Sequence, residues 1–191
     1  DGSIALYRPT VGVLLNVSLD HKSLDELRAL FGDYVQKAGC AVINLDNAEA
    51  GFLASKAGQL VTFGVQRPQA DISVIEGSIQ QSAFDIRAEV NEAGSDRTIH
   101  LLVPMPGMHN LSNALAALAA SKAAGVDLAK AATALSDFAG LARRFDVVGT
   151  NARRITVIDD FGHNPEKCAA TLRTLKSTPD EDGGRVLAFF Q

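Results

Sequence analysis

The hydrophobic positions at the start of the chain follow the pattern of a strand, a helix and a second strand. Residues 11–17 form an apolar run of the kind found in strands that are buried on both faces of a sheet. Apolar residues between 24 and 35 then recur at helical spacing, Gly39 is expected to end this helix, and residues 40–45 form a second buried strand. This order of elements predicts one right-handed crossover unit of a parallel sheet.

The middle of the chain has a different pattern, with short apolar runs separated by glycine and asparagine residues that favour turns. Some of these runs alternate apolar and polar positions, which is typical of antiparallel strands with one face in water. We therefore predict an antiparallel meander attached to the parallel sheet. The runs are residues 59–63, 71–76, 84–89 and 98–103.

Helical spacing returns after Gly107 and again after Asp127, which is expected to cap the second of two helices. The pattern loosens between residues 140 and 149, and a new strand–helix–strand unit begins at Ile155. This second segment is too short for a whole α/β domain, so we expect it to be truncated. The predicted domains are residues 1–142 and 143–191.

Composition narrows the class of protein. Of the 191 residues, 47% are hydrophobic and 21% are charged, as in ordinary soluble globular proteins. No run approaches the roughly 18 apolar residues that a spanning helix needs, and a net charge of −4 argues against nucleic-acid binding by bulk electrostatics. Cys40 and Cys168 lack metal or redox spacing, which favours a cytoplasmic setting. Because the chain starts without Met, we expect it to be a piece of a longer protein.

The segment after the apolar run at residue 155 carries the strongest candidate site. Asp159 and Asp160 end the strand, a glycine turns the chain, His163 follows, and an Asn-Pro pair opens a helix. The carboxyl end of a strand is where ligands bind in parallel α/β sheets, and an acidic residue there can accept hydrogen bonds from ribose hydroxyls. The alternative is that one of the two aspartates only caps the turn.

Two further segments suggest nucleotide contacts. Asn110 and Asn113 are three residues apart at the start of a helix, and paired carboxamides suit the edge of a purine, although they also suit a helix cap. Arg144 lies at the predicted domain junction, where an arginine can bind phosphate oxygens or form an ordinary ion pair.

His21 follows the first apolar strand and is a candidate metal ligand, with a hydrogen-bonded surface histidine as the alternative. No zinc-type spacing and no Ser/His/Asp or Cys/His set is present in the sequence. The phosphate-loop pattern G-x-x-x-x-G-K-[ST] is also absent from this chain, so we expect no cradle for a triphosphate in it.

Taken together, in this order and spacing, these motifs resemble the ATP-dependent Mur ligases of peptidoglycan synthesis, and the resemblance covers almost the whole chain. The Asp-Asp-aromatic-Gly-His form is most similar to the branches that add L-alanine or recycle murein tripeptide. Asn164 is instead similar to the His-Asn-Pro of other branches, including diaminopimelate- or lysine-adding and cyanophycin-type ligases. The segments that carry the resemblance are residues 1–3, 16–21, 44–46, 106–113, 143–145 and 159–165.

The resemblance implies the later part of a central ATPase domain followed by the start of a Rossmann-like C-terminal domain. It implies an ATP- and Mg²⁺-dependent ligase, with no nucleic-acid or membrane partner. Such an enzyme forms an amide between a UDP-N-acetylmuramate-type carboxylate and an amino acid or peptide through an acyl phosphate. Its role is in peptidoglycan synthesis or recycling. Because the phosphate loop is absent, the isolated chain is expected to have no turnover. The alternatives are a non-catalytic nucleotide-binding module and a folate- or cyanophycin-type ligase.

The resemblance also assigns roles to individual residues. His21 matches the histidine that binds magnesium. Several members carbamylate a lysine on the following helix, and the nearest candidate for it here is Arg28, so we expect that this chain has no carbamylated lysine. The remaining matches are ATP contacts. The signature whose asparagines contact adenine matches His109, Asn110 and Asn113. The arginine near the phosphates matches Arg144, the ribose contact matches Asp160, and the nearby histidine matches His163.

Overall fold

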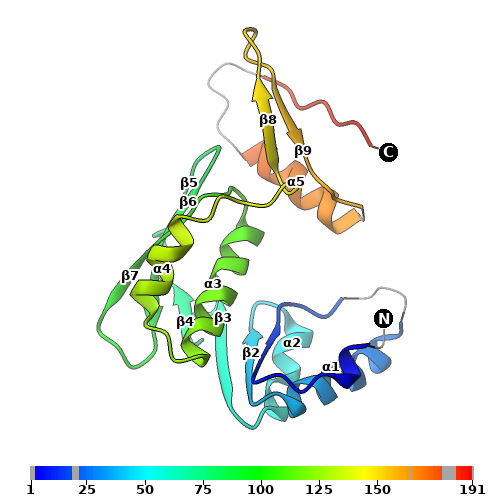
Figure 1. Cartoon of the computed structure of the whole chain (residues 1–191), viewed down its shortest axis with the longest axis vertical. Helices are drawn as coiled ribbons and strands as arrows, with labels where there is room; N and C mark the ends of the chain where they lie inside the picture. Colours follow the sequence, from blue (N-terminus) through cyan, green and yellow to red (C-terminus); the bar gives the residue numbers. More distant parts are fainter. Residues whose placement is uncertain (1–2, 19–21, 164, 178–183, 191) are drawn as a thin grey trace.

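The computed structural model describes residues 3–18, 22–163, 165–177 and 184–190. Figure 1 shows a larger α/β body followed by a smaller unit built from a β-hairpin and one helix. Among the described residues, no helix combines the length and the apolar character needed to cross a membrane.

Within the described residues, the larger sheet contains seven strands. They are β1 (Val11–Leu14), β2 (Cys40–Asn44), β3 (Leu60–Gly64), β4 (Ile72–Val74), β5 (Gln80–Gln81), β6 (Ile86–Glu92) and β7 (Thr98–Val103). The strands β1 to β4 pair in parallel in chain order, and β6 then pairs antiparallel with β4, β5 and β7. This arrangement confirms the predicted α/β class with a parallel sheet and an antiparallel extension.

The parallel part of the sheet is larger than the sequence predicted. The pattern places residues 59–63 and 71–76 in the antiparallel meander, but β3 pairs in parallel with β2, and β4 with β3. Asp71 provides the physical reason, because its carboxylate accepts hydrogen bonds at 2.7 Å from both the N–H and the hydroxyl of Thr62. These bonds hold the chain alongside the middle of β3, so that β4 begins in the parallel direction. The meander is therefore confined to β5, β6 and β7.

Helices cover both faces of this sheet (Figure 1). α1 (Leu24–Lys37) and α2 (Ala48–Leu53) pack on one face, and α3 (Met108–Ala123) and α4 (Leu128–Ser136) pack on the other. Short 3-10 turns lie at η1 (Ser3–Leu6) and η2 (Ala54–Lys56). The helix α2 was missed in the sequence because its six residues are too few to show a helical period.

The strand β2 separates two hydrophobic cores. Val42 packs in the cluster beneath α3 and α4, whereas Ala41 and Ile43 pack in the cluster beneath α1 and α2. All three residues are at most 1% exposed, because successive side chains of a strand point to opposite faces of the sheet. This double burial explains why the sequence of β2 is a continuous apolar run.

The smaller unit contains β8 (Asp146–Thr150), β9 (Thr156–Asp159) and α5 (Pro165–Ser177). The strand and helix predicted after Ile155 are present as β9 and α5, but β9 pairs antiparallel with β8, a strand that the sequence pattern did not predict. The second strand predicted for this unit is not seen in residues 184–190, which are irregular. In the described part of the chain, β9 has β8 as its one paired strand.

Candidate functional site

The candidate residues His109, Asn110 and Asn113 lie at the start of α3. Gly107 is the N-cap residue, so neither asparagine caps the helix, and its φ of +101° lies in the left-handed region that glycine favours. The Nδ2 group of Asn110 donates a hydrogen bond to the Pro106 carbonyl at 2.7 Å, and the residue is 8% exposed. Asn113 is exposed. Asn110 therefore fastens the turn before α3, whereas Asn113 is available to a ligand.

Asp160 follows β9 and ties the end of this strand to the preceding loop. Its Oδ2 accepts a hydrogen bond from the Phe145 N–H, and its Oδ1 accepts one from the Gly162 N–H, both at 2.9 Å. The Phe161 N–H donates to the Arg143 carbonyl at 2.8 Å. These bonds hold a loop in which Arg143 and Phe145 have positive φ values of 61° and 50°, which residues other than glycine seldom adopt. The turn-capping alternative is thus present, and each carboxylate oxygen keeps a further lone pair for a ligand.

Arg144 lies against the ring of Phe161 together with its neighbour Arg143. The two guanidinium carbons are 5.4 Å and 4.9 Å from the ring centroid, respectively. The Arg143 Nε atom is also 3.5 Å from the Asp159 carboxylate. Both arginines are exposed, so the junction presents two cations held by one aromatic ring.

His163 packs beside the same ring. Its ring centroid is 5.2 Å from that of Phe161 in an edge-to-face arrangement, and its Nδ1 is 3.2 Å from the Phe161 carbonyl oxygen. Its Nε2 is 3.3 Å from the Lys167 Nζ in the first turns of α5. His163 is therefore part of the turn that links β9 to α5, and its side chain is exposed.

The two groups of candidate residues meet where α5 approaches Gly107. A Cβ atom at this glycine would lie 2.6 Å from the Thr174 hydroxyl oxygen and 2.7 Å from the His109 ring, so there is no room for a larger residue. Partial burial of the His109 imidazole lowers its pKa, although the residue keeps an exposed surface. The Asp160 carboxylate opposes this effect on the pKa and the Arg173 guanidinium adds to it. His109 thus lies beside Gly107, where Thr174 of α5 approaches the start of α3.

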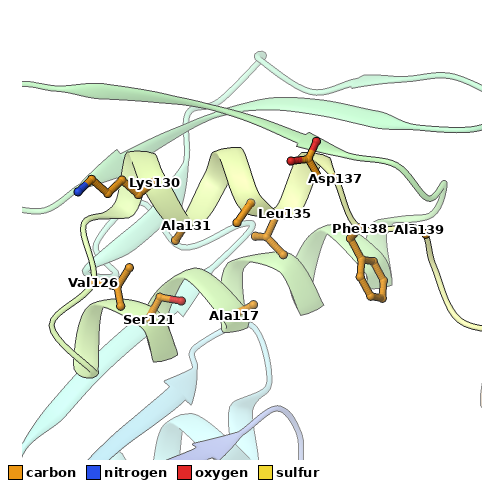
Figure 2. A pocket seen from close by; sticks show the side chains of 10 residues that line it. Ala117, Ser121, Val126, Lys130, Ala131, Leu135, Asp137, Phe138 and Ala139 are labelled. Carbon is orange, nitrogen blue, oxygen red and sulfur yellow. The ribbon is translucent and has the colours of Figure 1, made fainter.

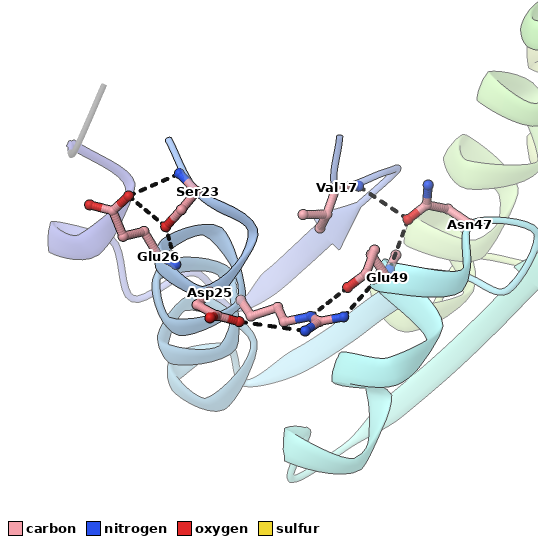
Figure 3. Close-up of polar contacts among 8 residues, drawn as sticks. Val17, Ser23, Asp25, Glu26, Asn47 and Glu49 are labelled. Carbon is pink, nitrogen blue, oxygen red and sulfur yellow. Dashed lines mark hydrogen bonds and ion pairs between the residues drawn. The ribbon is translucent and has the colours of Figure 1, made fainter. Parts of the chain in front are cut away.

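Arg28 is engaged by an acidic partner. Its Nε and its Nη2 donate to the two oxygens of Glu49 at 2.7 Å and 2.9 Å, which joins α1 to α2 (Figure 3). Hydrogen bonding to Arg28 lowers the pKa of Glu49, and the pKa of Arg28 rises for the same reason. The guanidinium also lies 5.4 Å from the centroid of the Phe52 ring. Arg28 therefore serves as a clamp between two helices.

The predicted metal ligand His21 lies outside the described residues. The described residues on either side are fixed by side-chain contacts (Figure 3). The Val17 N–H donates to Asn47 Oδ1 at 3.2 Å, and Ser23 and Glu26 form a reciprocal capping box at the start of α1. Among the residues that the structure describes, no group of three or more His, Cys, Asp or Glu side chains is arranged to hold a metal ion.

Two open grooves lie away from these residues. One, of about 550 Å³, runs between α3 and α4 and is lined mainly by small and apolar side chains such as Ala117, Ala131 and Phe138 (Figure 2). The other, of about 480 Å³, lies on β6 and β7 around Arg87 and His100. None of the six candidate ATP contacts lines either groove. The candidate site is instead a junction between α3 and the β9–α5 turn.

Comparison with known families covers both parts of the chain. A family described as the Mur ligase middle domain matches residues 2–121, and one described as Mur ligase, glutamate ligase domain matches residues 143–191. The chain belongs to the Mur ligase family.

Individual relatives of this Mur ligase chain are consistent with that result. The UDP-N-acetylmuramate–L-alanine ligase of Maricaulis maris is 35% identical over 204 aligned residues, which cover 100% of this chain and 42% of the relative. The enzyme of the same name from Caulobacter vibrioides is 34% identical, with the same coverage. The chain thus spans 42% of the length of these curated relatives.

Solved structures resemble this Mur ligase chain in fold. UDP-N-acetylmuramate-alanine ligase MurC from Thermotoga maritima has a TM-score of 0.77 at 27% identity, over 92% of this chain and 40% of that chain. MurF from Acinetobacter baumannii has a TM-score of 0.79 at 20% identity, over 93% and 39% of the two chains, and shows likeness of fold alone.

The structure of this Mur ligase chain adds residues to the site that the sequence did not indicate. Phe161 lies within the recognised motif, and its aromatic character could have pointed to the ring that holds Arg144. Thr174 lies on α5 with no local signal, because its proximity to Gly107 arises from the packing of two helices far apart in sequence. Its neighbour Arg173 was not indicated either, and its guanidinium adds to the effect of burial in lowering the pKa of His109.

Proposed function

We propose that this chain is the adenosine-binding part of an ATP-dependent ligase that joins a UDP-N-acetylmuramate-type carboxylate to an amino acid or peptide in peptidoglycan synthesis or recycling. The main support is the 35% identity, over 100% of this chain, to a relative named UDP-N-acetylmuramate–L-alanine ligase. The names of the relatives favour this substrate class over the folate- and cyanophycin-type alternatives.

The geometry at the start of α3 supports an adenine contact there. Asn113 presents an exposed carboxamide, which carries both a donor and an acceptor, one turn beyond the buried Asn110. This part of α3 is a helix N-terminus, and such termini favour anionic and polar ligands. We assign adenine recognition to Asn113, with Asn110 and His109 shaping the wall beside it.

The β9–α5 turn supports the contacts to the sugar and the phosphates. Asp160 is held in place by two backbone N–H groups and keeps lone pairs for a ribose hydroxyl. Arg144 is exposed on the Phe161 ring, from which its guanidinium can reach phosphate oxygens, and His163 lies beside the same ring. ATP would supply the phosphoryl group that activates the substrate carboxylate. His21 stays our proposed ligand for Mg²⁺, and residues 1–142 and 143–191 our proposed domains.

Binding of ADP tests the adenosine assignment in the 191-residue chain itself. Calorimetric titration should show ADP binding that Asn113→Ala weakens by about tenfold, the loss expected for one hydrogen-bonding side chain. Ser121→Ala, on the same helix but away from the junction, is the matched control and should bind as the unaltered chain does. If Asn113→Ala bound ADP as tightly as the unaltered chain does, the assignment of adenine recognition to Asn113 would be wrong.

The ligase reaction needs a different assay. Because the phosphate-loop pattern is absent from its sequence, the 191-residue chain should release no phosphate from ATP in the presence of UDP-N-acetylmuramate and L-alanine. A longer protein that contains this chain should release phosphate and form the amide with this substrate pair. Amide formation by the 191-residue chain alone would contradict the first expectation. Turnover of the longer protein with a folate substrate instead would contradict the second.

A further inference from the structure

Thr174 is buried, whereas the other residues of α5 whose exposure the structure describes are half-buried or exposed. Only 4% of Thr174 is exposed, while its neighbour Arg173 is an exposed residue on the same helix α5. The hydroxyl of Thr174 donates a hydrogen bond to the Ala170 carbonyl at 2.9 Å, one turn earlier. The side chain is therefore fixed in orientation, and its oxygen is the atom that lies closest to the empty side of Gly107.

Gly107 meets two separate requirements at this point. Its φ of +101° disfavours any residue with a Cβ atom, and an added Cβ would also lie 2.6 Å from the fixed Thr174 oxygen. Among the described residues, the other glycines with a positive φ, which are Gly77, Gly94, Gly125 and Gly140, meet only the first requirement. Gly125 has a φ of +81°, but a Cβ atom built on it has no neighbour within 4 Å among the described residues. Within the described part of the chain, a positive φ and a close neighbour therefore coincide only at Gly107.

We propose that Gly107 and Thr174 are positioning residues through which α5 docks on the start of α3. Docking at this point holds α5, into which the turn that carries Asp160 leads, against Gly107 and His109 at the start of α3. The adenine side of the site on α3 and the ribose and phosphate side on the β9–α5 turn then face one another. This inference rests on the proposed function, which supplies the ligand that the two sides share.

Distance measurements test docking without any ligand. Spin labels on Lys130→Cys and Lys176→Cys, both exposed positions, report the separation of α4 from the end of α5 once Cys40 and Cys168 are replaced by serine. Pulsed electron paramagnetic resonance should give one narrow distance distribution for this reference chain.

Two substitutions should broaden that distribution and shift it to longer distances. Gly107→Ala places a Cβ atom against Thr174, and Thr174→Gln extends a longer side chain towards the Gly107 backbone. Gly125→Ala controls for the strain of a positive φ, and Thr174→Ser keeps the hydroxyl, so both should preserve the narrow distribution. Thr174 belongs to neither of the two hydrophobic clusters of the larger body, so Thr174→Gln keeps the test valid if Gly107→Ala does not fold.

ADP titration of the same variants tests the positioning role. Gly107→Ala and Thr174→Gln should weaken ADP binding by about tenfold or more, with both controls unchanged. Unchanged distances in Thr174→Gln would overturn docking, and changed distances with unchanged ADP affinity would overturn the positioning role. Absence of ADP binding by the unaltered chain would instead contradict the proposed function, while the distances would still decide whether α5 docks through this contact.

Discussion

Replacement of Asp160 by asparagine separates its contribution to the turn from its proposed contact with a ligand. The carboxylate accepts hydrogen bonds from the Phe145 and Gly162 N–H groups through different oxygens, and a carboxamide has only one oxygen that can accept. One of the two bonds is therefore lost in Asp160→Asn. A hydrogen bond to a charged group contributes about 1.5–3 kcal/mol, and the lower end applies at this turn because it is partly exposed.

The loop before β8 is sensitive to a loss of this size. Arg143 and Phe145 each have a positive φ, and such a conformation costs about 1–2 kcal/mol per residue. The bonds from Phe145 to Asp160 and from Phe161 to the Arg143 carbonyl offset a cost of similar magnitude. A loss of about 1.5 kcal/mol should therefore raise the open population of this loop by about tenfold.

Hydrogen exchange at the Phe145 amide measures this opening directly. Protection of this amide should fall by about tenfold in Asp160→Asn and further in Asp160→Ala, which removes both acceptors. Asp159→Asn is the matched control, since Asp159 is an adjacent carboxylate whose contact is a 3.5 Å ion pair with an exposed arginine. Protection in Asp160→Asn equal to that of the control would refute the role of the Asp160 carboxylate in holding this turn.

Three further predictions concern the larger body. Leu115→Ala should lower the free energy of unfolding by about 2–5 kcal/mol in a urea titration followed by circular dichroism, because Leu115 is fully buried in the core beneath α3. Asn47→Ala should cost about 1–2 kcal/mol in the same assay, since its oxygen caps α2 at Ala50; an unchanged unfolding midpoint would contradict this role. Because hydrogen bonding to Arg28 lowers the pKa of Glu49, this ion pair stabilises the fold fully at pH values above the pKa that a glutamate has in the unfolded chain. This contribution is lost as pH falls through the lower folded pKa, so Glu49→Gln should flatten the acid limb of the stability profile.

The sequence predicted the first crossover unit well because its elements have strong and distinct periods. β1, α1 and β2 follow the predicted order, and the burial of β2 on both faces matches its unbroken apolar run. The direction of β3 and β4 was wrong, since short apolar runs do not encode strand direction. That direction depends on a contact between Asp71 and Thr62, which lie nine residues apart.

The candidate site shows the same division between local and non-local information. The motifs around Asn110 and Asp160 were found because each occupies a few consecutive residues with distinctive chemistry. The sequence could not indicate that α5 lies against Gly107, since Thr174 has an ordinary helical context and its burial depends on packing. β8 was missed because four of its five residues are exposed and lack an alternating pattern.

The position of β2 between two cores also determines how this fold responds to several changes at once. Leu118 belongs to the cluster on one side of β2 and Val35 to the cluster on the other, and both are at most 1% exposed. The free-energy costs of substitutions in groups that share no packing partner are additive. Side chains on one face of the sheet cannot move to fill a cavity on the other face, because the backbone of β2 lies between them. Each face of the sheet therefore supplies its own share of the stability, and neither can compensate for the other.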